Sequence, residues 1–173
     1  MTAKVKLLAD QYQSRALGET LRAANAGCDW ISEMAWAAQE FSPYGIHKLT
    51  YREARRRFGL PSQITVRCLS KVADAYKLDR ESQRRFQPLN AIAYDDRNLS
   101  WHLAEQTVSI ASTRGRLKIP FAAGARQLAL LATRQGESDL ILRHGVFYLA
   151  ATCNIEAPAP ADVDDFLGVD FGV

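Results

Sequence analysis

The chain has 173 residues, of which 47% are hydrophobic and 24% are charged. These proportions are typical of a soluble globular protein with one domain or two small ones, and they exclude a wholly disordered chain. No uncharged apolar stretch reaches the roughly 18 residues that a transmembrane helix requires, so we expect no membrane partner.

The net charge of +3 is too small to indicate a partner, but the charges are unevenly distributed. Residues 52–85 hold ten basic and four acidic residues, whereas residues 156–173 hold five acidic residues and no basic ones. Such segregation is typical of proteins with one region that faces a nucleic acid. A solvated helical face followed by an acidic tail explains the same pattern, so the charge alone leaves both interpretations open.

The cysteines and histidines form no metal-binding pattern. Cys28, Cys68 and Cys153 are far apart, and their odd number argues against a disulfide framework and favours a reducing compartment. The three histidines are equally scattered, so we expect no zinc site within the chain. Because the N-terminus also lacks the apolar segment of a secretory signal, we expect a cytoplasmic protein in which Cys28 and Cys68 are small core residues.

The N-terminal half predicts one strand and three helices. Residues 3–9 alternate between basic and apolar, and apolar residues then recur every three or four positions over 11–38, which predicts a long amphipathic helix. After a predicted loop over 41–45, Thr50 and Glu53 are spaced as a capping box. The helix that follows is expected to end at Gly59, and Pro61 can begin a third helix. The core face predicted for that third helix comprises Leu69, Val72, Ala73 and Tyr76.

From about residue 88 the pattern changes to short strands. The residues at 140–149 predict a β-hairpin with Gly145 at its turn, and residues 157–165, which are rich in Pro, Ala and Asp, predict a linker. Short strands at this spacing predict a small barrel, and therefore an α+β fold. The other elements predicted here are strands at 89–94, 99–103, 107–112 and 116–121, turns at 95–98 and 113–115, and a short helix at 127–133.

The last residues, Leu167-Gly-Val-Asp-Phe-Gly-Val173, place one acid, Asp170, in an apolar and glycine-spaced stretch. A buried strand would hold this carboxylate rigidly, and the glycines would let a phosphate backbone or a metal approach closely. Two-metal nucleases need such a carboxylate beside the scissile phosphate. Taken alone, the stretch is explained more simply as a buried strand with one polar residue at its edge.

Other stretches favour a catalytic interpretation of that motif, because they occur in an order and at spacings known from one family. They are Lys4–Leu8, Leu21–Trp30, Leu60–Gln63, Lys71–Tyr76, Ala93–Arg97, Gly115–Phe121 and Asp139–Leu149. Together with the terminal motif they resemble the N-terminal part of TnpB, the RNA-guided DNA endonuclease of bacterial transposons, which is related to the type V CRISPR effectors. The resemblance covers nearly all of the chain.

This resemblance implies a domain organisation. Residues 1–9 and 86–156 would form a wedge domain with an oligonucleotide-binding-type β-barrel, and residues 10–85 would form an inserted helical recognition domain. After the linker, residues 166–173 would be the orphan first strand of an incomplete RuvC nuclease domain, which has an RNase H-like fold. The chain would then be a truncated protein that ends at the first RuvC motif.

The resemblance also implies a catalytic role that this chain cannot fulfil alone. Asp170 matches the first catalytic aspartate of the RuvC domain, and it would bind Mg²⁺ in a complete domain. The family supplies a second and a third acid and a zinc ribbon farther along, and none of them can be matched in these 173 residues. Since one carboxylate cannot organise two Mg²⁺ ions, we expect this chain to hold no cofactor and to cleave no DNA by itself.

We therefore expect a nucleic-acid-binding protein whose partners are a guide RNA and a target DNA. In such complexes base pairing supplies the sequence specificity, and the protein contacts mainly backbone and shape. A stand-alone, non-catalytic RNA- or DNA-binding regulator derived from such a nuclease is the alternative. An unrelated small enzyme is disfavoured, because a turn explains Asp95 and Asp96 and no cysteine and histidine form a catalytic pattern.

The candidate binding residues are the basic ones of the second and third predicted helices. Three arginines at spacings of three and four share one helical face, and a fourth lies beside it. Guanidinium groups match phosphate oxygens, although a solvated face with Glu53 as a partial partner also explains the pattern. The candidates are Arg52, Arg55, Arg56, Arg57, Arg67 and Lys71.

Overall fold

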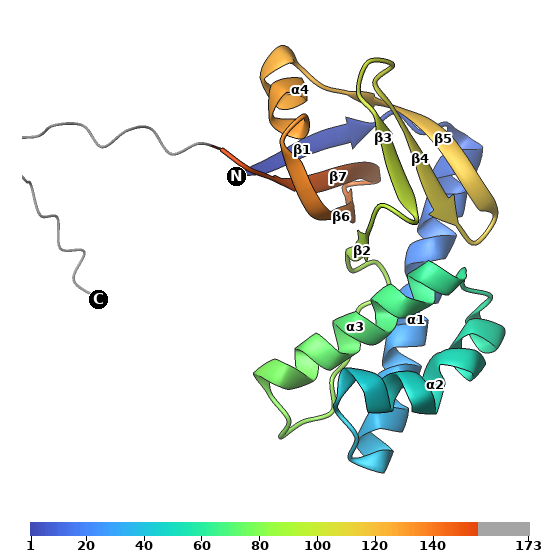
Figure 1. The fold of residues 1–173 in the computed structure, drawn as a ribbon. Helices are drawn as coiled ribbons and strands as arrows, with labels where there is room; N and C mark the ends of the chain where they lie inside the picture. The colour runs from blue at the N-terminus through green and yellow to red at the C-terminus, as the bar shows by residue number, and fades with distance from the viewer. Residues whose placement is uncertain (156–173) are drawn as a thin grey trace, which may run out of the picture.

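The computed structural model describes residues 1–155, which contain four helices and seven strands in an α+β arrangement (Figure 1). The predicted linker at 157–165 and the terminal strand with Asp170 lie outside the described residues. The elements, in chain order, are β1 (Thr2–Leu7), α1 (Gln11–Ala38), α2 (Pro43–Phe58), α3 (Ser62–Leu78), β2 (Ile92–Tyr94), β3 (Leu99–His102), β4 (Thr107–Ser112), β5 (Gly115–Ala122), α4 (Ala125–Leu131), β6 (Arg134–Arg143) and β7 (Val146–Cys153).

The seven strands form one antiparallel sheet in the order β2-β6-β7-β1-β5-β4-β3. Its two edge strands, β2 and β3, are joined by the four-residue turn at 95–98, so the edges lie close together and the sheet is nearly closed into a barrel. The hydroxyl of Tyr94 in β2 donates to the carbonyl oxygen of Ala111 in β4 over 3.0 Å, across the gap between the edges. The barrel expected from the short strands is confirmed at this level.

Every second side chain of β1 lies inside the barrel and is buried. In β1 the side chains of Ala3, Val5 and Leu7 are buried, while Lys4 and Lys6 between them are exposed. A strand presents successive side chains to opposite faces, so this pattern fixes which face of β1 lies inside. The alternation of basic and apolar residues that predicts this strand therefore matches its alternation of exposed and buried side chains.

The hairpin of β6 and β7 turns at His144 and Gly145, whose φ angles are +49° and +76°. Two successive residues with positive φ are what a type I′ turn requires, and this turn matches the right-handed twist of the flanking strands. The predicted hairpin is confirmed. The predicted strands at 99–103, 107–112 and 116–121 are also confirmed to within one residue, whereas β2 begins only at Ile92.

Helix α1 connects the barrel to the helical part of the molecule (Figure 1). Asp10 and Gln13 form a capping box at its start, in which the backbone N–H of Gln13 donates to the Asp10 carboxylate over 2.8 Å. Near the barrel, the hydroxyl of Thr20 accepts a hydrogen bond from the backbone amide of Thr113 over 3.0 Å. The remainder of α1 packs against α2 and α3. The predicted bounds, 11–38, are confirmed.

The start of α2 corrects the sequence analysis. The helix begins at Pro43, and Ser42 is its N-cap, with its hydroxyl accepting from the amide of Gly45 over 3.0 Å. Serine followed by proline at the first helical position is a strong start, and it overrides the later capping box. Thr50 instead lies in the middle of α2, and its hydroxyl donates to the Ile46 carbonyl oxygen over 2.7 Å. The end at Gly59, with φ +61°, is confirmed.

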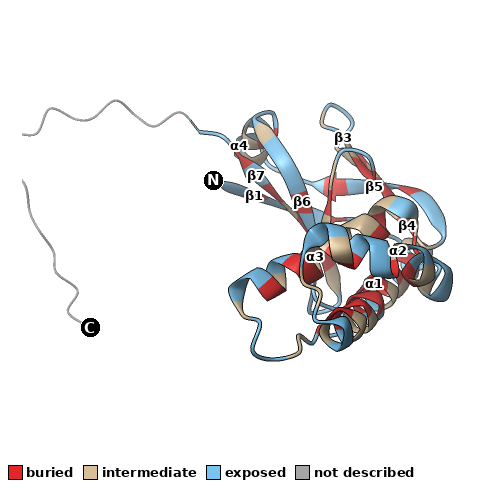
Figure 2. Cartoon of the chain, turned by 60° about the horizontal axis from the view of Figure 1, so that its bottom comes forward, coloured by how far each residue is buried: buried red, intermediate tan, exposed pale blue. Residues whose placement is uncertain are grey.

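Helices α1, α2 and α3 enclose a common core, and Figure 2 shows the burial of its residues. Tyr76 is fully buried, and its hydroxyl lies 2.8 Å from the Ser32 hydroxyl. The Phe41 ring packs against the Tyr76 ring with the centroids 4.4 Å apart. The predicted core residues of α3, namely Leu69, Val72, Ala73 and Tyr76, are all buried, as are Cys28 and Cys68. None of the helices within residues 1–155 is both long and apolar enough to cross a membrane.

Candidate nucleic-acid interface

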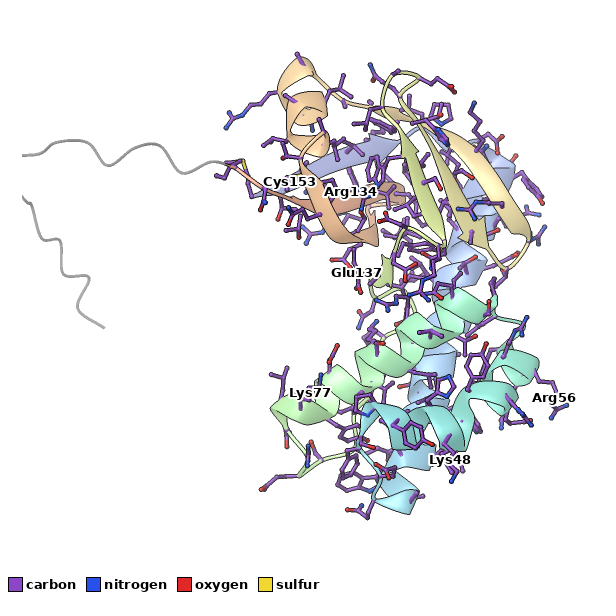
Figure 3. The ribbon with its side chains drawn as sticks, in the orientation of Figure 1. Lys48, Arg56, Lys77, Arg134, Glu137 and Cys153 are labelled. Atoms are coloured by element: carbon purple, nitrogen blue, oxygen red, sulfur yellow. The ribbon has the colours of Figure 1, made fainter. Side chains whose placement is uncertain are left out.

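Helix α2 presents a basic and aromatic face to solvent. Its buried residues, Ile46, Thr50 and Ala54, recur every fourth position and fix the inner side of the helix. The residues of the opposite side are exposed apart from the half-buried Tyr51, and the labelled side chains of Lys48 and Arg56 point away from the body of the molecule (Figure 3). We call this side the α2 outer face; it consists of Tyr44, His47, Lys48, Tyr51, Arg52, Arg55 and Arg56.

Arg52 and Arg55 are the two arginines of this face that form no ion pair within the described residues. Both are exposed, and no carboxylate within residues 1–155 lies at ion-pair distance from either of them. They lie three residues apart, which places both guanidinium groups on one side of the helix. Uncompensated guanidinium groups on an exposed helix are available to an anionic partner.

Arg56 and Arg57 are engaged by neighbouring side chains. Arg56 binds Glu53 with both ends of its fork, at 3.0 Å from Nε to Oε2 and 2.6 Å from Nη2 to Oε1. These hydrogen bonds lower the pKa of the Glu53 carboxyl group and raise that of Arg56. The guanidinium carbon of Arg57 lies 5.8 Å from the ring centroids of both Trp30 and Phe58. The expected partial pairing with Glu53 therefore applies to Arg56.

Arg67 lies at the junction of α3 with the barrel. Its guanidinium group donates to the Glu137 carboxylate of β6, and its Nε lies 3.7 Å from Oδ2 of Asp95. The Arg67 side chain is only 17% exposed. Two carboxylates thus compensate its charge, and this geometry gives Arg67 a role in holding α3 against the sheet.

Lys71 lies one turn farther along α3 and is bound in a similar way. Its Nζ donates to Oδ1 of Asn25 and to the Ala91 carbonyl oxygen, both over 2.8 Å, and lies 5.3 Å from the Phe86 ring centroid. It also lies near Asp139, where its positive charge lowers the pKa of the carboxyl group, although burial raises that pKa more strongly. Of the six basic candidates, the structure brings Arg52, Arg55 and Arg56 together and places Arg67 and Lys71 in the junction.

A groove of about 480 Å³ separates α3 from β2 and β6, and Glu137 and Lys77 lie along it in Figure 3. Basic and acidic side chains alternate in its lining, with Arg67 and Lys71 facing Glu137 and Asp139. Mixed charges on facing walls stabilise the junction but favour neither an anion nor a cation as a ligand. The groove is therefore a weaker candidate for binding than the α2 outer face.

The α2 outer face carries two adjoining hollows. One, of about 530 Å³, is lined by seven side chains between Tyr44 and Glu53, among them Tyr44 and His47, and the other, of about 350 Å³, includes Arg55. Tyr51 and Arg52 line both hollows, so aromatic rings and guanidinium groups border one continuous surface.

The sequence analysis missed the aromatic part of this surface. The loop predicted over 41–45 and the helix start predicted at Thr50 do not place Tyr44, His47 and Tyr51 on one face. The Ser42-Pro43 pair, a common start of a helix, would have revealed them.

Within residues 1–155, no three histidine, cysteine, aspartate or glutamate side chains lie close enough together to hold a metal ion. Asp170, the expected Mg²⁺ ligand and catalytic acid, lies outside the described residues. Comparison with models of protein families and with curated proteins finds no match for the chain. The geometry of α2 and the resemblance of the sequence stretches are therefore the two arguments that bear on function.

Proposed function

We propose that the chain binds nucleic acid through the α2 outer face, with Arg52 and Arg55 contacting backbone phosphates. The observation that carries the proposal is the exposure of these two guanidinium groups on one side of a helix, with no carboxylate partner in the described part of the chain. Guanidinium forks match phosphate oxygens in geometry and charge. Phosphate contacts position a protein on a nucleic acid without reading its sequence.

The remaining basic candidates have secondary roles in this proposal. Arg56 can turn from Glu53 toward a phosphate, because both side chains are solvent-exposed and such pairs are weak. Arg57 supports the surface by covering Trp30. Arg67 and Lys71 keep α3, and with it the helical part, in place against the barrel.

The resemblance to TnpB supports a guide RNA and a target DNA as the nucleic acids. In this proposal the seven-stranded barrel is the oligonucleotide-binding-type wedge domain, and residues 10–85 are the recognition helices. Cleavage would require a complete RuvC domain with Asp170 and Mg²⁺, and the activity proposed for the described residues is binding. A stand-alone binding regulator would use the same surface, and the gene distinguishes the two: a reading frame that continues into further acidic motifs and cysteine pairs supports the nuclease.

The binding surface is tested by the salt dependence of affinity. The logarithm of the association constant falls with the logarithm of salt concentration by about 0.9 per neutralised phosphate on B-form DNA and about 0.7 on a single strand. In fluorescence anisotropy with labelled RNA and DNA of several sequences, Arg52→Ala/Arg55→Ala should lower this slope by roughly one to two units. The loss of affinity should be similar for unrelated sequences.

A charge-matched control uses Lys6 and Arg126, which are exposed in β1 and α4, away from α2 (Figure 1). Lys6→Ala/Arg126→Ala removes the same two charges outside the α2 outer face, and it should lower the slope less than Arg52→Ala/Arg55→Ala does. An Arg52/Arg55 variant with unchanged slope and affinity, or a control variant with an equal loss, would contradict the proposed surface.

A further inference from the structure

The first half of the α2 outer face carries aromatic rings that the phosphate contacts do not use. His47 and Tyr51 lie one turn apart, and their rings are stacked with centroids 4.7 Å apart and planes within 12°. Tyr51 packs partly against the core, whereas His47 is exposed. The outer side of the His47 ring is therefore a flat aromatic surface, held in place by the ring beneath it.

Tyr44 extends this surface by one turn. It lies three residues before His47, and it is 78% exposed, which is unusual for a large aromatic residue. Its ring borders the same hollow of about 530 Å³ as His47 and Tyr51. Aromatic rings that are exposed around a hollow, rather than scattered singly, mark a binding surface.

Cations lie beside the rings on the same face. Lys48 and Arg52 line the hollow with the aromatic residues, and Arg55 borders the adjoining one. Residues 44–55 span about 16 Å along the helix axis. At about 3.4 Å per nucleotide, this length matches roughly five stacked nucleotides of one strand. Alternating rings and cations over such a length are the combination that binds single-stranded nucleic acid.

We propose that this half of α2 binds a single-stranded segment, with unpaired bases stacked on Tyr44 and His47 and with phosphates contacting Lys48 and Arg52. The inference rests on the proposed function and names its substrate class. In a duplex the faces of the bases are covered by their neighbours, so only a single strand can use the rings. Every base has a π face, so the surface selects for unpaired bases and not for a sequence.

The test compares two probes with equal backbone charge. One is a fluorescein-labelled 20-nucleotide oligothymidine, and the other is a 20-unit phosphodiester in which every site is abasic. The wild type should bind oligothymidine at least about fivefold more tightly than the abasic probe. Tyr44→Ala/His47→Ala should remove this preference and leave the salt slope unchanged, because no cation is lost.

Two further variants separate stacking from charge and from folding. Tyr44→Phe/His47→Phe keeps both rings and should keep the preference, whereas Arg52→Ala/Arg55→Ala should lower the slope for both probes and keep their ratio. Alanine is the best helix former, and positions 44 and 47 are exposed, so the alanine variant should fold as the wild type does, with an unchanged circular dichroism spectrum.

The outcomes distinguish the two proposals. Equal wild-type affinity for both probes, with the effect of Arg52 and Arg55 intact, would overturn base stacking and leave phosphate binding standing. Binding of neither probe would overturn both proposals. Polyglutamate of similar charge should bind more weakly than oligothymidine, and equal binding would show that the surface takes an acidic protein segment instead.

Discussion

The ammonium group of Lys71 donates a hydrogen bond to Oδ1 of Asn25 over 2.8 Å, and this contact joins α3 to α1 where both helices meet the barrel. The Asn25 side chain also donates to the carbonyl oxygens of Pro88 and Asn90, at 3.3 and 2.8 Å, and Lys71 donates to that of Ala91. The segment that leads into β2 is thus held to both helices by one polar network. A basic residue of the most positive part of the sequence serves the fold here.

Lys71→Met should lower the free energy of unfolding by about 1–2 kcal/mol. Methionine keeps most of the side-chain stem but leaves the buried Oδ1 of Asn25 without its donor, and an unpaired buried acceptor costs free energy. Urea denaturation measures the change. The salt dependence of nucleic-acid binding should stay as in the wild type. A variant with unchanged stability and a lower slope would instead place Lys71 on the binding surface.

The ion pair of Arg67 and Glu137 should couple α3 to β6. In a double-mutant cycle with Arg67→Met and Glu137→Gln, we expect a coupling free energy of about 1 kcal/mol, because the arginine is mostly buried while the glutamate is half exposed. The exposed pair of Lys77 and Asp74 is the matched control, and its coupling should not exceed about 0.5 kcal/mol. Equal coupling free energies in both pairs would show that burial of Arg67 in the junction does not strengthen its ion pair.

The sequence predicts those elements whose pattern is local. The periodicity over residues 11–38 predicts α1 with its observed bounds. The turn at Gly145 is also as predicted, but β6 and β7 extend the hairpin from the predicted 140–149 to 134–153. The prediction for the start of α2 was wrong because the sequence contains two capping patterns, one at Ser42 and one at Thr50. The proline after Ser42 decides between them, because it favours the first helical position.

The basic candidates show why a site is harder to predict than an element. The sequence indicates how many cations are close together, but not which of them are compensated. Arg67 finds its carboxylate 70 residues away, and Lys71 finds its amide 46 residues away. The path of the chain through the barrel brings Glu137 to Arg67, and the packing of α1 against α3 brings Asn25 to Lys71. Arg52 and Arg55 remain free because their helix face points away from that junction.

The gain in stability that Asp139→Asn gives over the wild type should increase as pH rises from acid to neutral. Burial raises the pKa of Asp139 above its ordinary value, although Lys71 opposes the shift. The folded state therefore disfavours the charged carboxylate, and it loses stability as pH rises through the folded-state pKa. Asp139→Asn should remove this penalty and stabilise the protein at pH 7. Because Asp139 is exposed on one side, solvent screening limits the gain to about 0.5 kcal/mol.

This gain should shrink toward acid, because the wild-type carboxyl group becomes protonated in both states below its unfolded pKa of about 3.9. Paired urea titrations of wild type and variant at pH 7 and pH 4 measure the difference. A variant that is less stable than the wild type at pH 7 would show that attraction to Lys71 outweighs the burial of the carboxylate.

Two glycine-to-alanine changes should shift stability in opposite directions. Gly145 has a φ of +76° in the type I′ turn, and this conformation costs an alanine about 1 kcal/mol or more. Gly145→Ala should therefore destabilise the protein by about that amount. The cost comes from the backbone alone, because nothing lies within 4 Å of the added methyl group. Gly18 lies inside α1, where alanine is favoured over glycine by about 1 kcal/mol. The methyl group of Gly18→Ala would meet the flexible end of Arg22 at 3.4 Å and the Phe147 ring at 4.0 Å, so the contact offsets little of that gain. Urea denaturation of both variants compares the two effects directly. A Gly145→Ala variant as stable as the wild type would show that the hairpin can adopt another turn, and the geometry of β6 and β7 would then depend on their pairing rather than on Gly145.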